Sequence, residues 1–263
     1  ASCRDNTPEM WLTQFFAKFN EISSHVALAK SAMSNAEWVD SQGSLEDLES
    51  LLRVLRKLCT DMPKLQRVAD VLISLGLDEF RPETLVDLRA NREHLLELYQ
   101  LALTRCAWVS TSVDYENFKR LYARISQSSV LSSSQHDEWM ENAAGVRSFK
   151  HLRQELTDLT TSFACIDGIV NRLRSVESQL ILTTNQQLIL AQSIPCIVSQ
   201  KERCEARLAY VSARADHQDF NELYQDCLQD PVLQISGIFG DADVWLMLNG
   251  VQRNLLEVTR DLK

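Results

Sequence analysis

A repeat of about 102 residues is the feature that most constrains what this 263-residue chain can fold into. Residues 107–122 recur at 209–224, and seven positions are identical at an offset of 102: Ala107, Val109, Ser110, Asp114, Phe118, Leu121 and Tyr122. Tryptophan recurs with nearly the same spacing, at Trp38, Trp139 and Trp245. Self-similarity at a fixed period indicates an array of similar units rather than one large globule.

Apolar residues within each unit follow a heptad pattern. One series takes alternating steps of three and four through Leu45, Leu48, Leu52, Leu55, Cys59 and Met62. A second series begins at Phe149 and superimposes on the first at an offset of 104. A third, which begins at Leu88, superimposes at 102 on one that begins at Leu190. A mean spacing of 3.5 residues places these side chains on one seam of a helix that packs in coiled-coil fashion.

Residues that typically begin or end helices divide the chain into helical segments. Glycine and proline total 12 residues, fewer than a β-sandwich or a dinucleotide-binding fold needs for its turns, so the composition also favours long helices. We expect helices over 8–36, 44–75, from 82, 112–127, 146–181, from 186 and from 216, and a broken helix from about 245. Because 83–128 contain neither glycine nor proline, the helix that starts at 82 is expected to continue into the next unit as one rod.

Three helices per unit, a period near 104 and a third helix that continues into the next unit resemble the spectrin-repeat superfamily. Residues 44–58 and 92–105 resemble that family's second and third helices most closely. The resemblance implies an all-α fold of tandem three-helix bundles: repeat 1 over 1–112, repeat 2 over 113–215 and a partial third repeat over 216–263. One departure is the tryptophan, which the family usually places in the first helix and which here precedes the second.

The resemblance implies a structural role without chemistry. We expect a spacer and protein-docking scaffold from a larger cytoskeletal or nuclear-envelope linker, similar to nesprin-type proteins of the LINC complex, which position nuclei, or to spectraplakins. Its expected partners are cytoskeletal, motor or nuclear-envelope proteins, with self-association as a further option. The expected location is the cytoplasm, or the outer nuclear membrane or cytoskeleton through regions outside this chain. The chain begins with Ala1 and Ser2 rather than Met, so we expect it to be a piece of a longer protein.

Acid-flanked tryptophans are the candidate docking residues. The flanking acids are Glu37 and Asp40 around Trp38, and Glu138 and Glu141 around Trp139. These segments are similar to the tryptophan-acidic peptides that bind kinesin light chains, which suggests a motor or cargo adaptor as the alternative function. Such a peptide must be extended and accessible. The competing interpretation is that each tryptophan packs at the corner between the first and second helices of its own bundle, because large aromatic side chains are usually buried.

The remaining features favour structural roles. The motif at Phe118, Leu121 and Tyr122, with its copy at Phe220, Leu223 and Tyr224, is either a partner patch or the start of the next bundle's core. Pro63 and Pro195 are each a flexible joint, a static bend or a break between two helices. Cysteines on apolar helix faces are typical of reduced core thiols.

The sequence gives no support for catalysis, or for binding to a metal, a cofactor, nucleic acid or a membrane. The five histidines are scattered singly, and no glycine-rich phosphate loop or nucleophile motif is present. The net charge of -9 disfavours nucleic acid, whose phosphates attract basic surfaces. No apolar run reaches the roughly 18 residues of a membrane-spanning helix. We therefore expect a non-enzyme without cofactor or metal, and no membrane contact by this part of the chain.

Overall fold

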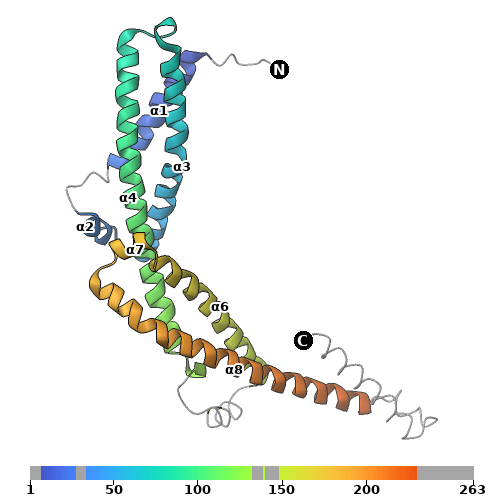
Figure 1. Cartoon of the computed structure of the whole chain (residues 1–263). Helices are drawn as coiled ribbons and strands as arrows, with labels where there is room; N and C mark the ends of the chain where they lie inside the picture. Colours follow the sequence, from blue (N-terminus) through green and yellow to red (C-terminus); the bar gives the residue numbers. More distant parts are fainter. Residues whose placement is uncertain (1–6, 28–33, 132–138, 140–147, 230–263) are drawn as a thin grey trace. The chain divides into compact units, whose positions relative to one another are not determined.

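The structure is a computed structural model that describes residues 7–27, 34–131, 139 and 148–229. Within these residues the fold is all-α, as the sequence predicts, and no strand is present. The α-helices are α1 (Pro8–Ala27), α2 (Asn35–Asp40), α3 (Leu45–Leu75), α4 (Pro82–Ser126), α6 (Phe149–Leu173), α7 (Val176–Ile181) and α8 (Thr184–Gln229). Two 3₁₀ turns, η1 (Gly76–Asp78) and η2 (Ser129–Leu131), follow α3 and α4 (Figure 1).

The helix boundaries follow from local chemistry. Ser44 caps α3 through a capping box, in which its hydroxyl accepts a hydrogen bond from the backbone of Asp47 while the Asp47 carboxylate accepts one from the backbone of Ser44. Gly76 ends α3 at a φ of 65°, a left-handed value that favours glycine. Pro82 occupies the first turn of α4, where a missing N–H costs nothing.

Two expected helices are interrupted. The helix predicted over 8–36 is interrupted at Ser34, which caps the separate short helix α2 with a second capping box to Glu37. The helix predicted over 146–181 breaks after Leu173, and α7 starts afresh because the Ser175 hydroxyl accepts a hydrogen bond from the backbone of Ser178. Both predictions of one uninterrupted helix were therefore wrong, and in both places a serine cap offers the backbone an alternative to continued helix.

The two longest helices are continuous, as predicted. Helix α4 has 45 residues and α8 has 46. Both prolines lie inside helices that continue through them, Pro63 in α3 and Pro195 in α8, so neither proline splits its helix in two. Each removes one backbone hydrogen bond, since the ring nitrogen carries no hydrogen.

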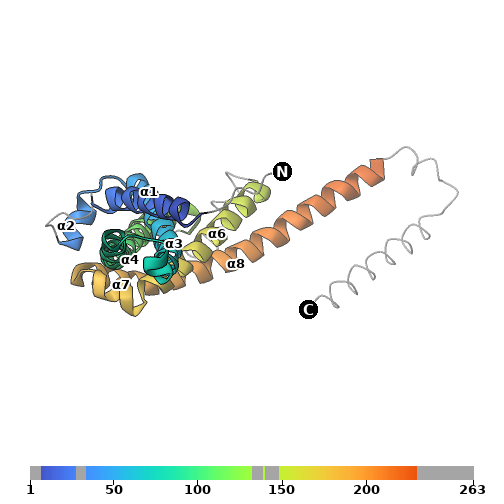
Figure 2. The same ribbon diagram turned by 90° about the horizontal axis from the view of Figure 1, so that it is seen from above.

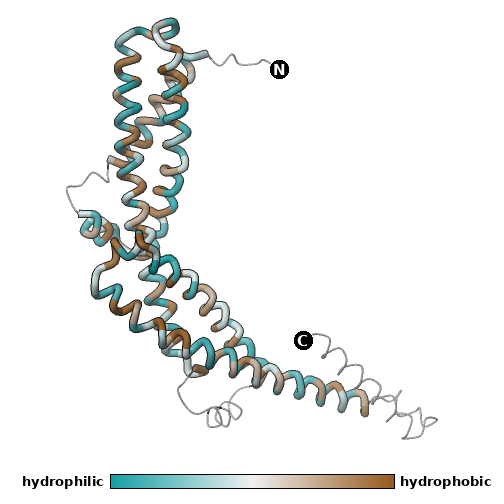
Figure 3. Tube along the Cα trace, in the orientation of Figure 1, coloured by the Kyte–Doolittle hydropathy of each residue, from teal (hydrophilic) through white to brown (hydrophobic). Residues whose placement is uncertain are grey.

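One hydrophobic core joins α1, α3 and α4, which lie side by side along much of their length (Figures 1 and 2). Figure 3 shows hydrophobic residues alternating with hydrophilic ones along these helices, as expected where one face of a helix is buried. The fully buried members come from all three helices: Phe15 and Ile22 from α1, Met62, Ala69 and Leu72 from α3, and Leu88, Leu95, Leu98 and Ala102 from α4.

Burial repeats with the period of the sequence. At an offset of 102, buried positions of α4 match buried positions of α8: Leu88 and Leu190, Leu95 and Ile197, Ala102 and Cys204, Arg105 and Arg207, Val109 and Val211, Val113 and Ala215. At 104, buried positions of α3 match those of α6: Leu48 and Leu152, Leu52 and Leu156, Leu55 and Leu159, Met62 and Ile166, Leu65 and Ile169, Ala69 and Leu173. The same heptad positions are therefore buried in both copies of the sequence repeat.

The chain divides into two compact units, residues 1–131 with 159–202, and residues 132–158 with 203–263. In the first unit, Arg172 of α6 donates two hydrogen bonds, of 2.9 and 2.8 Å, to the carboxylate of Asp114 in α4. This bond raises the pKa of Arg172. In the second unit, Arg153 and Lys150 of α6 pair with Asp216 and Asp219 of α8 at 2.9 and 2.6 Å.

Candidate functional site

The first candidate residue, Trp38, is buried. Its side chain is 5% exposed and belongs to a cluster with Leu48, Leu52 and Leu55 of α3 and Val109 of α4. The short helix α2 therefore packs its tryptophan where the chain turns into α3. This position agrees with the corner-packing interpretation of the tryptophans.

A buried arginine lies against the Trp38 ring. The guanidinium carbon Cζ of Arg105 is 4.2 Å from the ring centroid, and Arg105 is only 3% exposed. Burial lowers the pKa of Arg105, because a charged group loses hydration in an apolar environment. The face of an indole ring attracts a cation, and this attraction is strongest where water is excluded. Trp38 thus replaces part of the hydration that the arginine loses.

The second candidate residue, Trp139, repeats this arrangement. Trp139 is 5% exposed, and Cζ of Arg207 lies 4.4 Å from its ring centroid. Arg207 is 1% exposed, and burial is the main cause that lowers its pKa to about 10. Because Arg105 and Arg207 are 102 residues apart, each unit of the sequence contains one arginine–tryptophan pair.

The flanking acids have separate roles. Glu37 and Asp40 are both exposed on α2. The Glu37 carboxylate accepts a 3.0 Å hydrogen bond from the Ser34 backbone, which lowers the pKa of Glu37. Glu37 therefore caps α2. The other two acids, Glu138 and Glu141, lie outside the described residues. The structure brings Trp38 together with Arg105 rather than with its own flanking acids, and docking through an extended Trp38 segment stays a prediction that requires α2 to leave the cluster.

Sequence reasoning missed both arginines. The heptad series that begins at Leu88 passes through Cys106, whereas the buried side of α4 runs through Ala102, Arg105 and Val109 at steps of three and four. The signal was available, because an arginine stands at both positions of the 102-residue repeat and at a core step of the heptad. Arginine is almost never fully buried unless it is paired, so the residue type by itself does not indicate a core position.

The repeated aromatic motif has two different environments. In α4, Phe118 is fully buried, and its ring stacks on Tyr122 at 5.9 Å. In α8, Phe220 stacks on Tyr224 in the same way at 6.2 Å, but Phe220 is 57% exposed. We call the exposed face the α8 stripe; it comprises three residues at helical spacing, Phe220, Leu223 and Tyr224. The sequence left open whether the motif is a partner patch or part of a core; one copy is buried in a core and the other is exposed.

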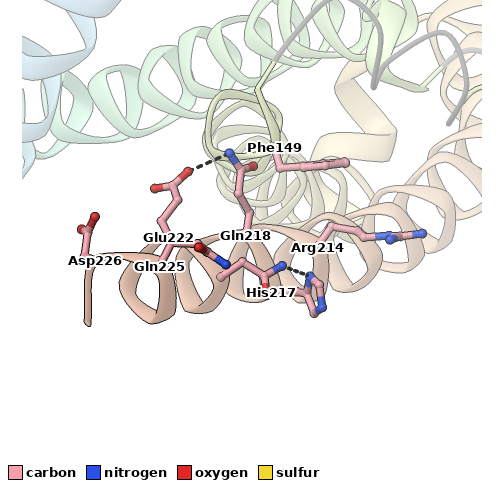
Figure 4. A pocket seen from close by; sticks show the side chains of 8 residues that line it. Phe149, Arg214, His217, Gln218, Glu222, Gln225 and Asp226 are labelled. Atoms are coloured by element: carbon pink, nitrogen blue, oxygen red, sulfur yellow. Dashed lines mark hydrogen bonds between the residues drawn. The ribbon is translucent and has the colours of Figure 1, made fainter. Parts of the chain in front are cut away.

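One open depression lies beside this part of α8 (Figure 4). It has a volume of about 540 Å³, and Phe149 lines it together with side chains of α8 such as Arg214 and Gln218. Its polar groups bond along the helix: Gln218 donates to Glu222 at 2.9 Å, and Asn221 and His217 are hydrogen-bonded at 3.1 Å. They do not converge on one point, as the groups of a catalytic site do.

The described part of the chain contains neither a metal-binding cluster nor a membrane-spanning helix. Among those residues, no group of three or more His, Cys, Asp or Glu side chains is placed to hold a metal ion. No described helix is both long and apolar enough to cross a membrane.

Comparison with protein-family models, curated proteins and solved structures finds no match to this chain.

Proposed function

We propose that this chain is a helical spacer and protein-docking scaffold made of tandem three-helix bundles like spectrin repeats, and that it belongs to a larger cytoskeletal or nuclear-envelope linker. The observation that carries the proposal is the pair of long helices, α4 and α8, which bury the same register 102 residues apart. A helix of 45 residues is about 68 Å long at 1.5 Å per residue. A helix that is shared between successive bundles couples them mechanically, which suits a spacer.

Continuity of α4 is the testable part of the spacer role. Helix α4 contributes Leu95 and Ala102 to the core with α1 and α3, and then Val109 and Val113 to the cluster around Trp38. Inserting Gly-Pro after Val113 would break the helix and separate these clusters from Phe118. We expect a melting temperature at least 5 °C lower and a broader transition. The matched control is the same insertion after Gln42, in the turn between α2 and α3, which should change the melt less. Equal melts for the two insertions would contradict the coupling.

The α8 stripe supports the docking role. Its apolar residues repeat at steps of three and four, as in a helix face that packs on another helix. Asp219 and Asp226 border one edge of this face, Asp219 as the ion-pair partner of Lys150 at 2.6 Å, and the whole chain carries a net charge of -9. A basic amphipathic helix of a partner protein complements both the shape and the charge of the stripe.

A peptide experiment tests this docking partner. The probe is a designed helical peptide with leucine on one face and lysine on its flanks, and the control peptide carries glutamate at the lysine positions. We expect the lysine peptide to bind the full chain at least tenfold more tightly by fluorescence anisotropy, and to bind the Phe220→Ser/Leu223→Ser variant at least tenfold more weakly. Equal binding of the two peptides, or unchanged binding by the variant, would refute the basic-helix partner.

The oligomeric state separates a partner from a second copy of the chain. Analytical ultracentrifugation of the unliganded protein should give a monomer. A dimer that disappears in the Phe220→Ser/Leu223→Ser variant would mean that a second copy covers the stripe, and the basic-helix proposal would be wrong.

A further inference from the structure

Two cysteines face each other across the α3–α4 hairpin. Cys59 belongs to α3 and Cys106 to α4, and both are partly buried. The hairpin register is fixed on either side of them, by a 2.8 Å bond from Arg92 to Asp70 and by a 3.5 Å bond from Asn117 to Glu49. In an antiparallel helix pair, the residue numbers of two facing positions add up to a nearly constant value. The value for Cys59 and Cys106 falls between the value for Arg92 with Asp70 and the value for Asn117 with Glu49.

The surroundings of the thiols are apolar. Cys59 packs against the core of α1, α3 and α4, and Cys106 packs against the cluster around Trp38. The pKa of Cys59 is raised to about 11, mainly by burial and in addition by charge repulsion from Cys106 and by the contact between the two thiols. The register of the hairpin brings the two thiols together in this partly buried, apolar site.

The second copy of the hairpin lacks this pair. At the offsets of the repeat, 104 in the first helix and 102 in the second, Cys59 corresponds to Phe163 and Cys106 to Leu208. Hydrophobic residues therefore occupy both corresponding positions, so thiols are not needed at this step of the heptad pattern. The cysteine pair adds a chemistry to the first hairpin that its counterpart cannot perform.

We propose that Cys59 and Cys106 form a disulfide that joins α3 to α4 when the protein meets a peroxide. Hydrogen peroxide first converts one thiolate to a sulfenic acid: an S–O bond forms, the O–O bond breaks and hydroxide leaves as water after protonation. The second sulfur then attacks the sulfenic sulfur, the S–S bond forms, the S–O bond breaks and a second water leaves. In total, two thiols lose two electrons and two protons, and one peroxide becomes two waters.

The rate and the effect of this reaction follow from the site. Because the thiolate is the reacting species and the pKa of Cys59 is high, the reaction should be slow at pH 7 and faster at pH 9. The bond closes a loop from residue 59 to residue 106, which restricts the unfolded chain and should raise the melting temperature by roughly 5–15 °C. Reduction should reverse the shift.

The test uses the full chain with four of its other cysteines replaced and only the buried Cys204 kept beside the pair. The background variant carries serine at the exposed positions 165, 196 and 227 and at position 3, so that these thiols do not compete. After treatment with hydrogen peroxide and alkylation, tryptic digestion without reductant should give one linked species, residues 58–64 joined to residues 106–119. The Cys106→Ser variant should give no linked species and no shift in melting temperature.

The opposing outcomes are equally clear. If both cysteines remain alkylatable in the folded background variant while the same peroxide oxidises the exposed cysteines of the unmodified chain, the proposal is wrong. If the linked peptide forms only after unfolding in urea, the two thiols do not meet in the native hairpin and the proposal is also wrong.

Discussion

The same substitution at two equivalent positions should have very different effects. Phe118 and Phe220 are 102 residues apart, each stacks on a tyrosine four residues later, and the two ring planes meet at 6° and 11°. Phe118 is fully buried, whereas Phe220 is 57% exposed. Replacing each with alanine therefore removes the same atoms from the same local geometry, and only the packing around them differs.

The magnitudes follow from burial. Phe118→Ala loses the transfer free energy of the ring and leaves a cavity, so it should lower the free energy of unfolding by about 3–5 kcal/mol. Phe220→Ala removes a ring that water already covers over most of its surface. Alanine is also the better helix former by a few tenths of a kcal/mol, so Phe220→Ala should lower the free energy of unfolding by only about 0–1 kcal/mol. The expected difference of about 3 kcal/mol is more than a hundredfold in the folding equilibrium.

Urea denaturation followed by circular dichroism at 222 nm measures this difference, since the signal reports helix and none of the changed residues contributes strongly to it. A cost below about 1 kcal/mol for Phe118→Ala would refute the burial argument for α4. A cost for Phe220→Ala as large as that for Phe118→Ala, in a monomer, would mean that the chain itself covers the α8 stripe, and the docking proposal would fall.

Three further predictions concern other parts of the described chain. In a double-mutant cycle between Trp38→Leu and Arg105→Met, urea denaturation should give a coupling energy of about 1–2 kcal/mol, and a value near zero would mean that ring and cation do not interact. Pro63→Ala should raise the free energy of unfolding by about 1–3 kcal/mol, because alanine restores a backbone hydrogen bond inside α3; a destabilised variant would show that the ring packs better than it disrupts. Hydrogen bonds from the side chain and the backbone of Ser44 lower the pKa of Asp47 below its ordinary value of 3.8. The charged carboxylate therefore stabilises the fold at pH values above 3.8, and this stabilisation is lost as the pH falls through the lowered pKa. The melting temperature of Asp47→Asn should therefore lie below that of the unmodified chain at pH 7 and approach it once the carboxyl group of Asp47 is protonated, and a difference that persists in strong acid would contradict the capping role.

Heptad periodicity predicted most of the buried positions of the long helices. Leu48, Leu52 and Leu55 of α3 are buried where the pattern places them, because a spacing of 3.5 residues gives a helix one face whatever it packs against. The helix breaks were harder to predict. Residues 9–42 contain no glycine or proline, yet the helix predicted over 8–36 is interrupted at Ser34. The motif from Ser34 to Glu37 was the readable signal, since a serine followed three residues later by glutamate favours a new helix start.

Exposure of the α8 stripe could not be predicted. The motif at Phe118 and the motif at Phe220 share phenylalanine, leucine and tyrosine at the same spacing, yet one is buried and the other exposed. A single sequence records which residues can enter a core and does not record which segment covers them. The cysteine pair was missed for a similar reason: Cys59 and Cys106 were each placed on an apolar seam, but their meeting depends on the register between two helices.

The two arginine–tryptophan pairs suggest why polar groups lie in so regular an apolar pattern. A heptad seam of leucines packs nearly as well after a slip of seven residues, so hydrophobic contacts alone fix the register of α4 weakly. A buried cation changes this, because only one register brings Arg105 to the Trp38 ring and every other register leaves the charge in an apolar layer. The repetition of this pair at Arg207 and Trp139 places one such constraint in each unit. If this reasoning is right, Arg105→Met should retain most of the stability and lose uniqueness of packing. Near-ultraviolet circular dichroism would then weaken while the signal at 222 nm persists, whereas unchanged spectra in both regions would show that the apolar contacts fix the register without the arginine.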